Sequence, residues 1–373
     1  MKEGEMKSTF AKVGAGFLLG ATAIAGVATA ANSEPVGVKA CADKRTQALY
    51  LSPSGTCSSA RTLVVLGGSS IDVKTIAALV TPSVVSIKVT SVDGSGTGSG
   101  SIYQTSSTSS YIITNNHVVE GAATNGTIIV ELLNGDTYPA TIVGRDSTYD
   151  IAVIKVDKGN LPVITIGDSS KLSVGDPVVA IGSPLGLAST VTSGIVSALN
   201  RPVTTGTTGA ESYVNAIQTD AAINPGNSGG ALLDASGKIV GVNSAIATLT
   251  SGGTSGSIGL GFSIPMNEAK RVIDELITTG KSTRPLLGIY FDTTYTGVGA
   301  KISKLSPGEG AEKAGIPVGS VIRSIDGVKI ADQIGAIVRI RSYAPGATVK
   351  VVVDLPEGGQ KSFSVLLGSA PSN

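Results

Sequence analysis

A glycine-rich pentapeptide, Gly226-Asn227-Ser228-Gly229-Gly230, places a serine where the chain must turn tightly. A serine hydroxyl acts as a nucleophile when it is exposed on such a turn beside a base. Glycine tolerates a positive φ, and the N–H groups of Gly226 and Ser228, with Asn227 as a third candidate, can converge on an oxyanion. The pentapeptide therefore indicates a nucleophile with an oxyanion hole. An ordinary turn explains it as readily, since the chain contains 49 glycines.

The base for that serine can only be His117, the one histidine among 373 residues. Asp150 begins an apolar run, and its carboxylate can accept from the Nδ1–H of His117, which leaves Nε2 to take the proton of Ser228. Each residue alone has a structural explanation, as a buried histidine or as a turn aspartate before a strand. Together they follow the chain order His, Asp, Ser, which is that of chymotrypsin.

Long motifs surround these three residues. They are TNNHVVEGA (114–122), DIAVIKV (150–156) and QTDAAINPGNSGGALLD (218–234), accompanied by TPSVVSI (81–87), GSGSI (98–102) and GLGFSIP (259–265). The sequence over roughly residues 72–370 resembles the HtrA/Deg family of serine proteases. The resemblance implies a chymotrypsin-like double β-barrel with His117, Asp150 and Ser228 as the catalytic triad. It implies no cofactor.

The family pattern also suggests which residues line the S1 pocket. These are Ile223, Ile246 and Leu260, all apolar, and no acidic residue stands on the expected pocket floor to receive an Arg or Lys side chain. We therefore predict cleavage after aliphatic residues. Each of the three residues also fits a plain core position.

The C-terminal segment, SPGEGAEKAGIPVGSVIRSIDGVKI (306–330), resembles the PDZ modules that follow HtrA proteases. Such modules bind an extended C-terminal peptide as an added strand. The resemblance places the carboxylate-binding loop at Leu286, Leu287, Gly288 and Ile289, with Arg284 nearby. It further implies a homotrimer and control by peptide binding, for which the loop Asn200–Tyr213 is the candidate relay.

Short Val-, Ile- and Thr-rich runs broken by Gly, Asn, Asp and Ser predict a mainly β fold. Helices are expected at 72–80, before Pro82, and where apolar residues recur from Ala269 to Ile277 ahead of Gly280. The predicted organisation is a protease domain at 72–280 followed by an α+β PDZ domain at 284–370.

The N-terminus carries an apolar run, Val13–Ala30, after a lysine-containing start. We interpret residues 1–30 as a cleaved secretory signal or a retained membrane anchor, which places the remainder outside the cytoplasm. In that setting Cys41 and Cys57 form a disulfide in a small module at 36–66, although two free thiols remain an alternative.

The net charge and the histidine count exclude other function classes. The net charge of +1 gives no basis for nucleic-acid binding, and a single histidine rules out a histidine-cluster metal site. The leading hypothesis is a serine endopeptidase that cleaves unfolded or misfolded proteins outside the cytoplasm, secreted or tethered to the membrane. The alternative is a chaperone-like or scaffolding peptide binder with little proteolysis.

Overall fold

The computed structural model describes residues 38–46, 48–66, 71–92, 94–183, 189–205, 212–244 and 257–372. The chain divides into two compact units, Met1–Ser70 and Ile71–Asn373. The apolar run proposed as a signal or anchor lies outside the described residues. Within the described part of the chain, no helix has the length and apolarity needed to cross a bilayer.

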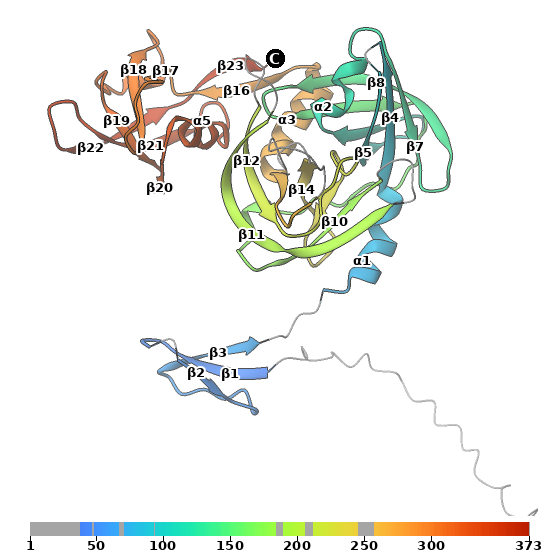
Figure 1. The fold of residues 1–373 in the computed structure, drawn as a ribbon, viewed down its shortest axis with the longest axis horizontal. Helices are drawn as coiled ribbons and strands as arrows, with labels where there is room; N and C mark the ends of the chain where they lie inside the picture. The colour runs from blue at the N-terminus through green and yellow to red at the C-terminus, as the bar shows by residue number, and fades with distance from the viewer. Residues whose placement is uncertain are drawn as a thin grey trace, which may run out of the picture. The chain divides into compact units, whose positions relative to one another are not determined.

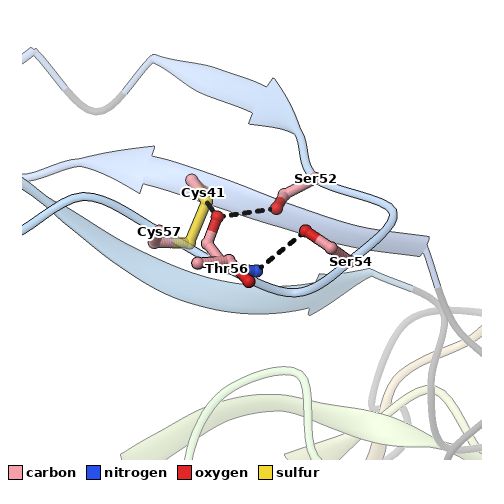
Figure 2. Close-up of a disulfide and its surroundings, with 5 residues drawn as sticks. All are labelled: Cys41, Ser52, Ser54, Thr56 and Cys57. Atoms are coloured by element: carbon pink, nitrogen blue, oxygen red, sulfur yellow. Dashed lines mark hydrogen bonds between the residues drawn. A yellow bond between two sulfur atoms is a disulfide. The ribbon is translucent and has the colours of Figure 1, made fainter.

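The N-terminal unit contains a three-stranded antiparallel sheet. Its strands lie in the order β2-β1-β3, with bounds β1 (Val38–Asp43), β2 (Leu49–Leu51) and β3 (Arg61–Leu66). A disulfide joins Cys41 to Cys57 across a sequence separation of 16 residues. Figure 2 shows the loop that it closes, in which the Ser52 hydroxyl donates to the carbonyl of Thr56.

Two closed six-stranded barrels form the larger part of the second unit (Figure 1). The first barrel runs β4-β5-β6-β9-β8-β7, with bounds β4 (Val84–Ser91), β5 (Gly94–Thr105), β6 (Ser110–Thr114), β7 (Thr127–Glu131), β8 (Thr137–Asp146) and β9 (Ile151–Val156). Inward-facing valines and isoleucines fill it, including the fully buried Ile87, Ile102 and Ile154.

The second barrel repeats the strand order of the first. It runs β10-β11-β12-β15-β14-β13, with bounds β10 (Pro177–Gly182), β11 (Thr190–Thr205), β12 (Ser212–Thr219), β13 (Ala231–Leu233), β14 (Ile239–Ser244) and β15 (Gly261–Pro265). The predicted mainly β fold with a chymotrypsin-like double barrel is confirmed.

Helices cover the barrels at a few places. They are α1 (Val73–Val80), α2 (Asn116–Val119) and α3 (Met266–Thr279), with 3₁₀ turns at Thr81–Ser83, Glu120–Ala122 and Ser169–Lys171. The apolar stripe of α3 is buried from Ala269 to Leu276 as its spacing predicts, and Gly280 ends the helix with a φ of 72°.

The C-terminal part of the unit, residues 282–372, has its own sheet and apolar core. Its elements are β16 (Ser282–Leu286), β17 (Ile289–Phe291), β18 (Ala300–Leu305), α4 (Gly310–Lys313), β19 (Val321–Ile325), β20 (Val328–Lys329), α5 (Gln333–Arg341), β21 (Thr348–Asp354), β22 (Gln360–Leu366) and β23 (Gly368–Ser372). The sheet order is β17-β18-β19-β21-β22, which leaves β17 at an edge. The last strand, β23, returns to pair with β16 (Figure 1).

Candidate active site

His117 and Asp150 come from the same end of two paired strands. His117 lies in α2, directly after β6, and Asp150 directly precedes β9. Because β6 and β9 are antiparallel, with Thr114 opposite Ala152, the end of one strand lies beside the start of the other. Barrel pairing therefore brings together two residues that are 33 positions apart.

The Asp150 carboxylate contacts two groups of His117, the ring Nδ1 and the backbone N–H. The Nδ1 atom of His117 lies 2.9 Å from both carboxylate oxygens, and the backbone N–H of His117 donates to Oδ1 at 3.0 Å. An acceptor at Nδ1 selects the tautomer that carries its proton there, so Nε2 is left as the basic nitrogen. Asp150 is 2% exposed, so solvent does not compete for this contact.

The backbone of Asp150 adopts a left-handed conformation, with a φ of 53°. Asn115 stabilises this turn by donating from Nδ2 to the carbonyl of Asp150 at 2.9 Å. A non-glycine residue at positive φ is uncommon, and aspartate is among those that tolerate it best. The turn thus directs the carboxylate towards His117 at a cost in backbone energy.

Ser228 follows a tight turn at Asn224–Asn227. The N–H of Asn227 donates to the carbonyl of Asn224 at 2.9 Å, Pro225 takes the second position and Gly226 the third with a φ of 95°. These are the features of a type II turn, whose third residue needs a positive φ and is therefore usually glycine.

The turn corrects one sequence prediction. The backbone N–H of Asn227 closes the turn and is not available to an oxyanion, which limits the candidate donors to Gly226 and Ser228. Ser228 itself is 5% exposed. In the described part of the chain, no three His, Cys, Asp or Glu side chains gather as metal ligands.

The sequence of this chain is similar to those of known serine proteases. The model of the trypsin-like peptidase domain matches residues 98–242. The chain is 47% identical over 310 residues to the serine protease PepD of Mycobacterium tuberculosis, covering 80% of this chain and 66% of that protein. It is 39% identical over 299 residues to the serine protease Do-like HtrA of Lactococcus lactis subsp. cremoris, covering 75% and 72%.

Solved structures agree with the sequence matches. The HtrA-type protease AlgW with a tripeptide superposes with a TM-score of 0.61 at 34% identity, covering 81% of this chain and 98% of that chain. The chain belongs to the HtrA-type serine proteases. It spans about two thirds of the length of PepD.

The structure describes two of the three residues expected to line the S1 pocket of this HtrA-type protease, Ile223 and Leu260. Ile223 is completely buried, and it packs in the core of the second barrel with neighbours such as Ile217 and Val240. Its assignment to the pocket wall is wrong, because an enclosed core side chain presents no surface to a substrate. Leu260 is 42% exposed before β15, and Ile246 lies outside the described residues.

The predicted peptide-binding loop lies where β16 leads into the edge strand β17. Gly288 has a φ of 79°, and a Cβ there would lie 2.2 Å from the Cβ of Glu309, so only glycine fits. Leu287 is buried, and Ile289 starts β17. Arg284 lies on β16 opposite Ala370.

Sequence reasoning missed residues that support the site of this HtrA-type protease. Ser244 places Oγ 3.4 Å from Oδ2 of Asp150 across the two barrels. Tyr149, next to Asp150, donates from its hydroxyl to the carbonyl of Arg341 at 3.0 Å. Neither residue carries a local signal, since both contacts join positions far apart in the sequence.

Proposed function

We propose that the protein is a serine endopeptidase with Ser228 as nucleophile, His117 as base and Asp150 as the residue that orients the base. The contact of Nδ1 of His117 with both oxygens of Asp150, at 2.9 Å, carries this proposal. It is the arrangement that holds an imidazole ready to accept a proton at Nε2.

The reaction proceeds in two half-reactions. The Ser228 Oγ attacks the scissile carbonyl carbon as His117 Nε2 takes its proton, and the carbonyl electrons move onto oxygen. The N–H groups of Gly226 and Ser228 stabilise that oxyanion. Collapse breaks the C–N bond, and His117 gives its proton to the leaving amine. Water, deprotonated by His117, then hydrolyses the acyl-enzyme and returns the serine.

Labelling with a fluorophosphonate, combined with casein turnover, tests the assignment. Wild-type protein should be labelled and should degrade casein, whereas Ser228→Ala should do neither while unfolding at the same temperature. Unlabelled wild-type protein that suppresses aggregation of a client without cleaving it would instead support the peptide-binding alternative.

The substrates that we propose are unfolded or misfolded proteins outside the cytoplasm. A relative from Halomonas elongata, 41% identical over 274 residues, is named a probable periplasmic serine endoprotease. The apolar character of Leu260 and Ile246 supports cleavage after Val, Ala, Ile or Leu. A peptide library cleaved mainly after Arg or Lys would contradict this preference.

Residues 284–370 act as a PDZ-like domain that regulates the peptidase. The edge strand β17, preceded by Gly288, supports peptide binding by strand addition. Contacts of α5 with the barrels support coupling between this domain and the peptidase. The Arg341 carbonyl accepts from the Tyr149 hydroxyl, and the Arg341 guanidinium lies 4.9 Å from the ring centre of Tyr213. Tyr213 in turn donates from its backbone N–H to the carbonyl of Thr148.

These contacts refine the relay predicted at Asn200–Tyr213, part of which lies outside the described residues. A peptide with a free aliphatic C-terminus should raise kcat/KM, and the same peptide as its C-terminal amide should not. Equal effects of the acid and the amide would argue against this regulation.

Sedimentation velocity would test the proposed homotrimer, and N-terminal sequencing would distinguish a cleaved signal from a retained tether.

A further inference from the structure

Ser99, on β5 of the first barrel, bonds to the nucleophile loop of the second barrel. Its hydroxyl donates to the carbonyl of Gly226 at 2.6 Å, and its backbone N–H donates to the carbonyl of Ser228 at 2.8 Å. The side chain is completely buried. One residue therefore holds the two carbonyls that belong to the two candidate oxyanion donors.

The remaining polar atoms of Ser99 are also engaged. Its Oγ accepts from the backbone N–H of Ser183 at 2.7 Å, at the end of β10. Its carbonyl accepts from the hydroxyl of Thr114 at 2.7 Å, three residues before His117. Ser99 thus connects the strand before the base, the nucleophile loop and the end of β10.

Close packing keeps this connection in place. A Cβ on Gly229 would lie 2.1 Å from the carbonyl oxygen of Ser99, so the loop approaches β5 as closely as only glycine allows. Buried hydrogen bonds in such an enclosed place are strong, and a partner that is left unpaired there is costly. The hydroxyl therefore has a large influence on the conformation of the loop.

The bond to Gly226 restrains the catalytic turn in particular. In a type II turn the direction of the central N–H depends on the orientation of the peptide planes around the third residue. The carbonyl of Gly226 belongs to the plane that follows Gly226, and Ser99 fixes that plane. The Asn227 N–H in that plane also bonds the carbonyl of Asn224, so without the hydroxyl the plane keeps one of its two restraints, and the N–H of Gly226, in the preceding plane, is held less firmly.

We infer that Ser99 is a positioning residue that holds the oxyanion turn from the neighbouring barrel without touching substrate. The inference rests on the proposed role of Ser228 as nucleophile. Its consequence is specific to the transition state, because an oxyanion exists there and not in the bound substrate. Removal of the hydroxyl should therefore lower kcat and leave KM nearly unchanged.

The chain offers a matched control on the same strand. Ser101 is also completely buried, and its Oγ has no hydrogen-bond partner among the described residues. Ser101→Ala deletes the same atom from the same strand without touching the nucleophile loop. Ser99→Cys replaces the hydroxyl with a thiol, which is a larger group and a much weaker donor, so it weakens the hydrogen bond without removing the side-chain atom.

The experiment compares Ser99→Ala, Ser99→Cys, Ser101→Ala and wild type in the full chain. For Ser99→Ala we expect kcat to fall by about ten- to a hundredfold, with KM within about twofold. A peptidyl boronic acid, whose tetrahedral adduct occupies the oxyanion site, should bind more weakly by a similar factor. A product peptide should bind as before, Ser99→Cys should be intermediate, and Ser101→Ala should match wild type.

Two results would overturn the inference. One is a wild-type kcat in a folded Ser99→Ala or Ser99→Cys variant, which would make the hydroxyl purely structural. The other is an equal loss of kcat in Ser101→Ala. Failure of the proposed nucleophile is seen separately, as fluorophosphonate labelling that persists in Ser228→Ala.

Discussion

The two barrels share one strand order but hold their catalytic groups in different ways. The first barrel fixes His117 and Asp150 through side-chain hydrogen bonds at the ends of paired strands. The second barrel presents Ser228 after a backbone turn that depends on the positive φ of Gly226.

The two halves of the site should therefore be sensitive to different changes. In the first barrel the chemical identity of each side chain decides the function, so replacements of similar shape should still be damaging. In the second barrel the backbone conformation decides the function of the donors, so a single added methyl group should be damaging.

The largest effect is expected on the first-barrel side from His117→Ala. We expect kcat to fall by about 10⁶, since removing a triad base alone nearly eliminates triad catalysis. The chain has no other histidine that could substitute. Burst and steady-state assays would measure the loss, and an unchanged unfolding temperature would exclude misfolding. Retention of more than about a thousandth of the activity would contradict the assignment.

Asp150→Asn should have the next largest effect, about 10⁴ in kcat. Asparagine tolerates the left-handed backbone at this position, so the fold should persist. The loss arises because an amide no longer selects the Nδ1–H tautomer of His117 or stabilises its imidazolium. Kinetics beside circular dichroism would test this, and near wild-type turnover would show that Asp150 is a turn residue only.

On the second-barrel side, Gly226→Ala should lower kcat by about 10²–10³ through loss of one oxyanion donor. The methyl group disfavours the observed φ of 95° and so the type II turn. Gly135→Ala is the matched control, because Gly135 has a φ of 86° and open space around its Cβ position. It should lose stability without losing kcat; equal kinetic losses in both would refute the argument.

Tyr149→Phe asks whether the first-barrel half also depends on a remote element. Burial raises the pKa of the Tyr149 hydroxyl above its usual range, so it remains a donor to the carbonyl of Arg341. We expect the basal kcat to change less than about threefold, while activation by a C-terminal peptide falls by at least about fivefold.

Tyr103→Phe supplies the control for that experiment. Its hydroxyl bonds Asp274 on α3 at 2.7 Å, a bond of similar kind that does not involve α5. Peptide activation should therefore survive in this variant. A Tyr149→Phe enzyme that keeps its full peptide response would contradict the proposed link between α5 and the turn at Asp150.

The smallest effect concerns Glu268, where α3 meets the second barrel. Burial raises the pKa of Glu268 to about 7. The Asn215 amide, which donates to Glu268 at 2.8 Å, and the nearby Arg339 and Arg271 act in the opposite direction but have a smaller effect. An unfolded glutamate titrates near pH 4.3, so wild-type protein loses stability as the pH rises from about 4.5 to 7.

Glu268→Gln removes this titration. The unfolding temperature of wild-type protein minus that of the variant should be a few degrees lower at pH 7.5 than at pH 4.5. Differential scanning calorimetry across this range would measure the gap, and a gap independent of pH would contradict the raised pKa.

Local sequence patterns were sufficient to predict much of this molecule. The apolar spacing of α3, the strands beside His117 and Asp150, and the glycine turn before Ser228 all depend on neighbouring residues. Other features could not be predicted in this way. The bonds of Ser99 to Gly226 and Ser183 span 127 and 84 positions, and a buried serine looks like any other in the sequence.

The error at Ile223 has a related cause. An apolar residue near a nucleophile fits a pocket and a core equally well, and only closure of the second barrel decides between them. The role of Asn227 was likewise fixed by a turn hydrogen bond that composition does not reveal.

The disulfide of the N-terminal sheet has a consequence for the redox behaviour of the protein. Cys41 and Cys57 are the only cysteines in the chain, and both belong to the first unit. Leu49 and Leu51 remain exposed there, so this small sheet depends heavily on its covalent link. A thiol reductant should therefore unfold the sheet while the peptidase continues to turn over, which makes the first unit the part of the enzyme that responds to thiol reduction.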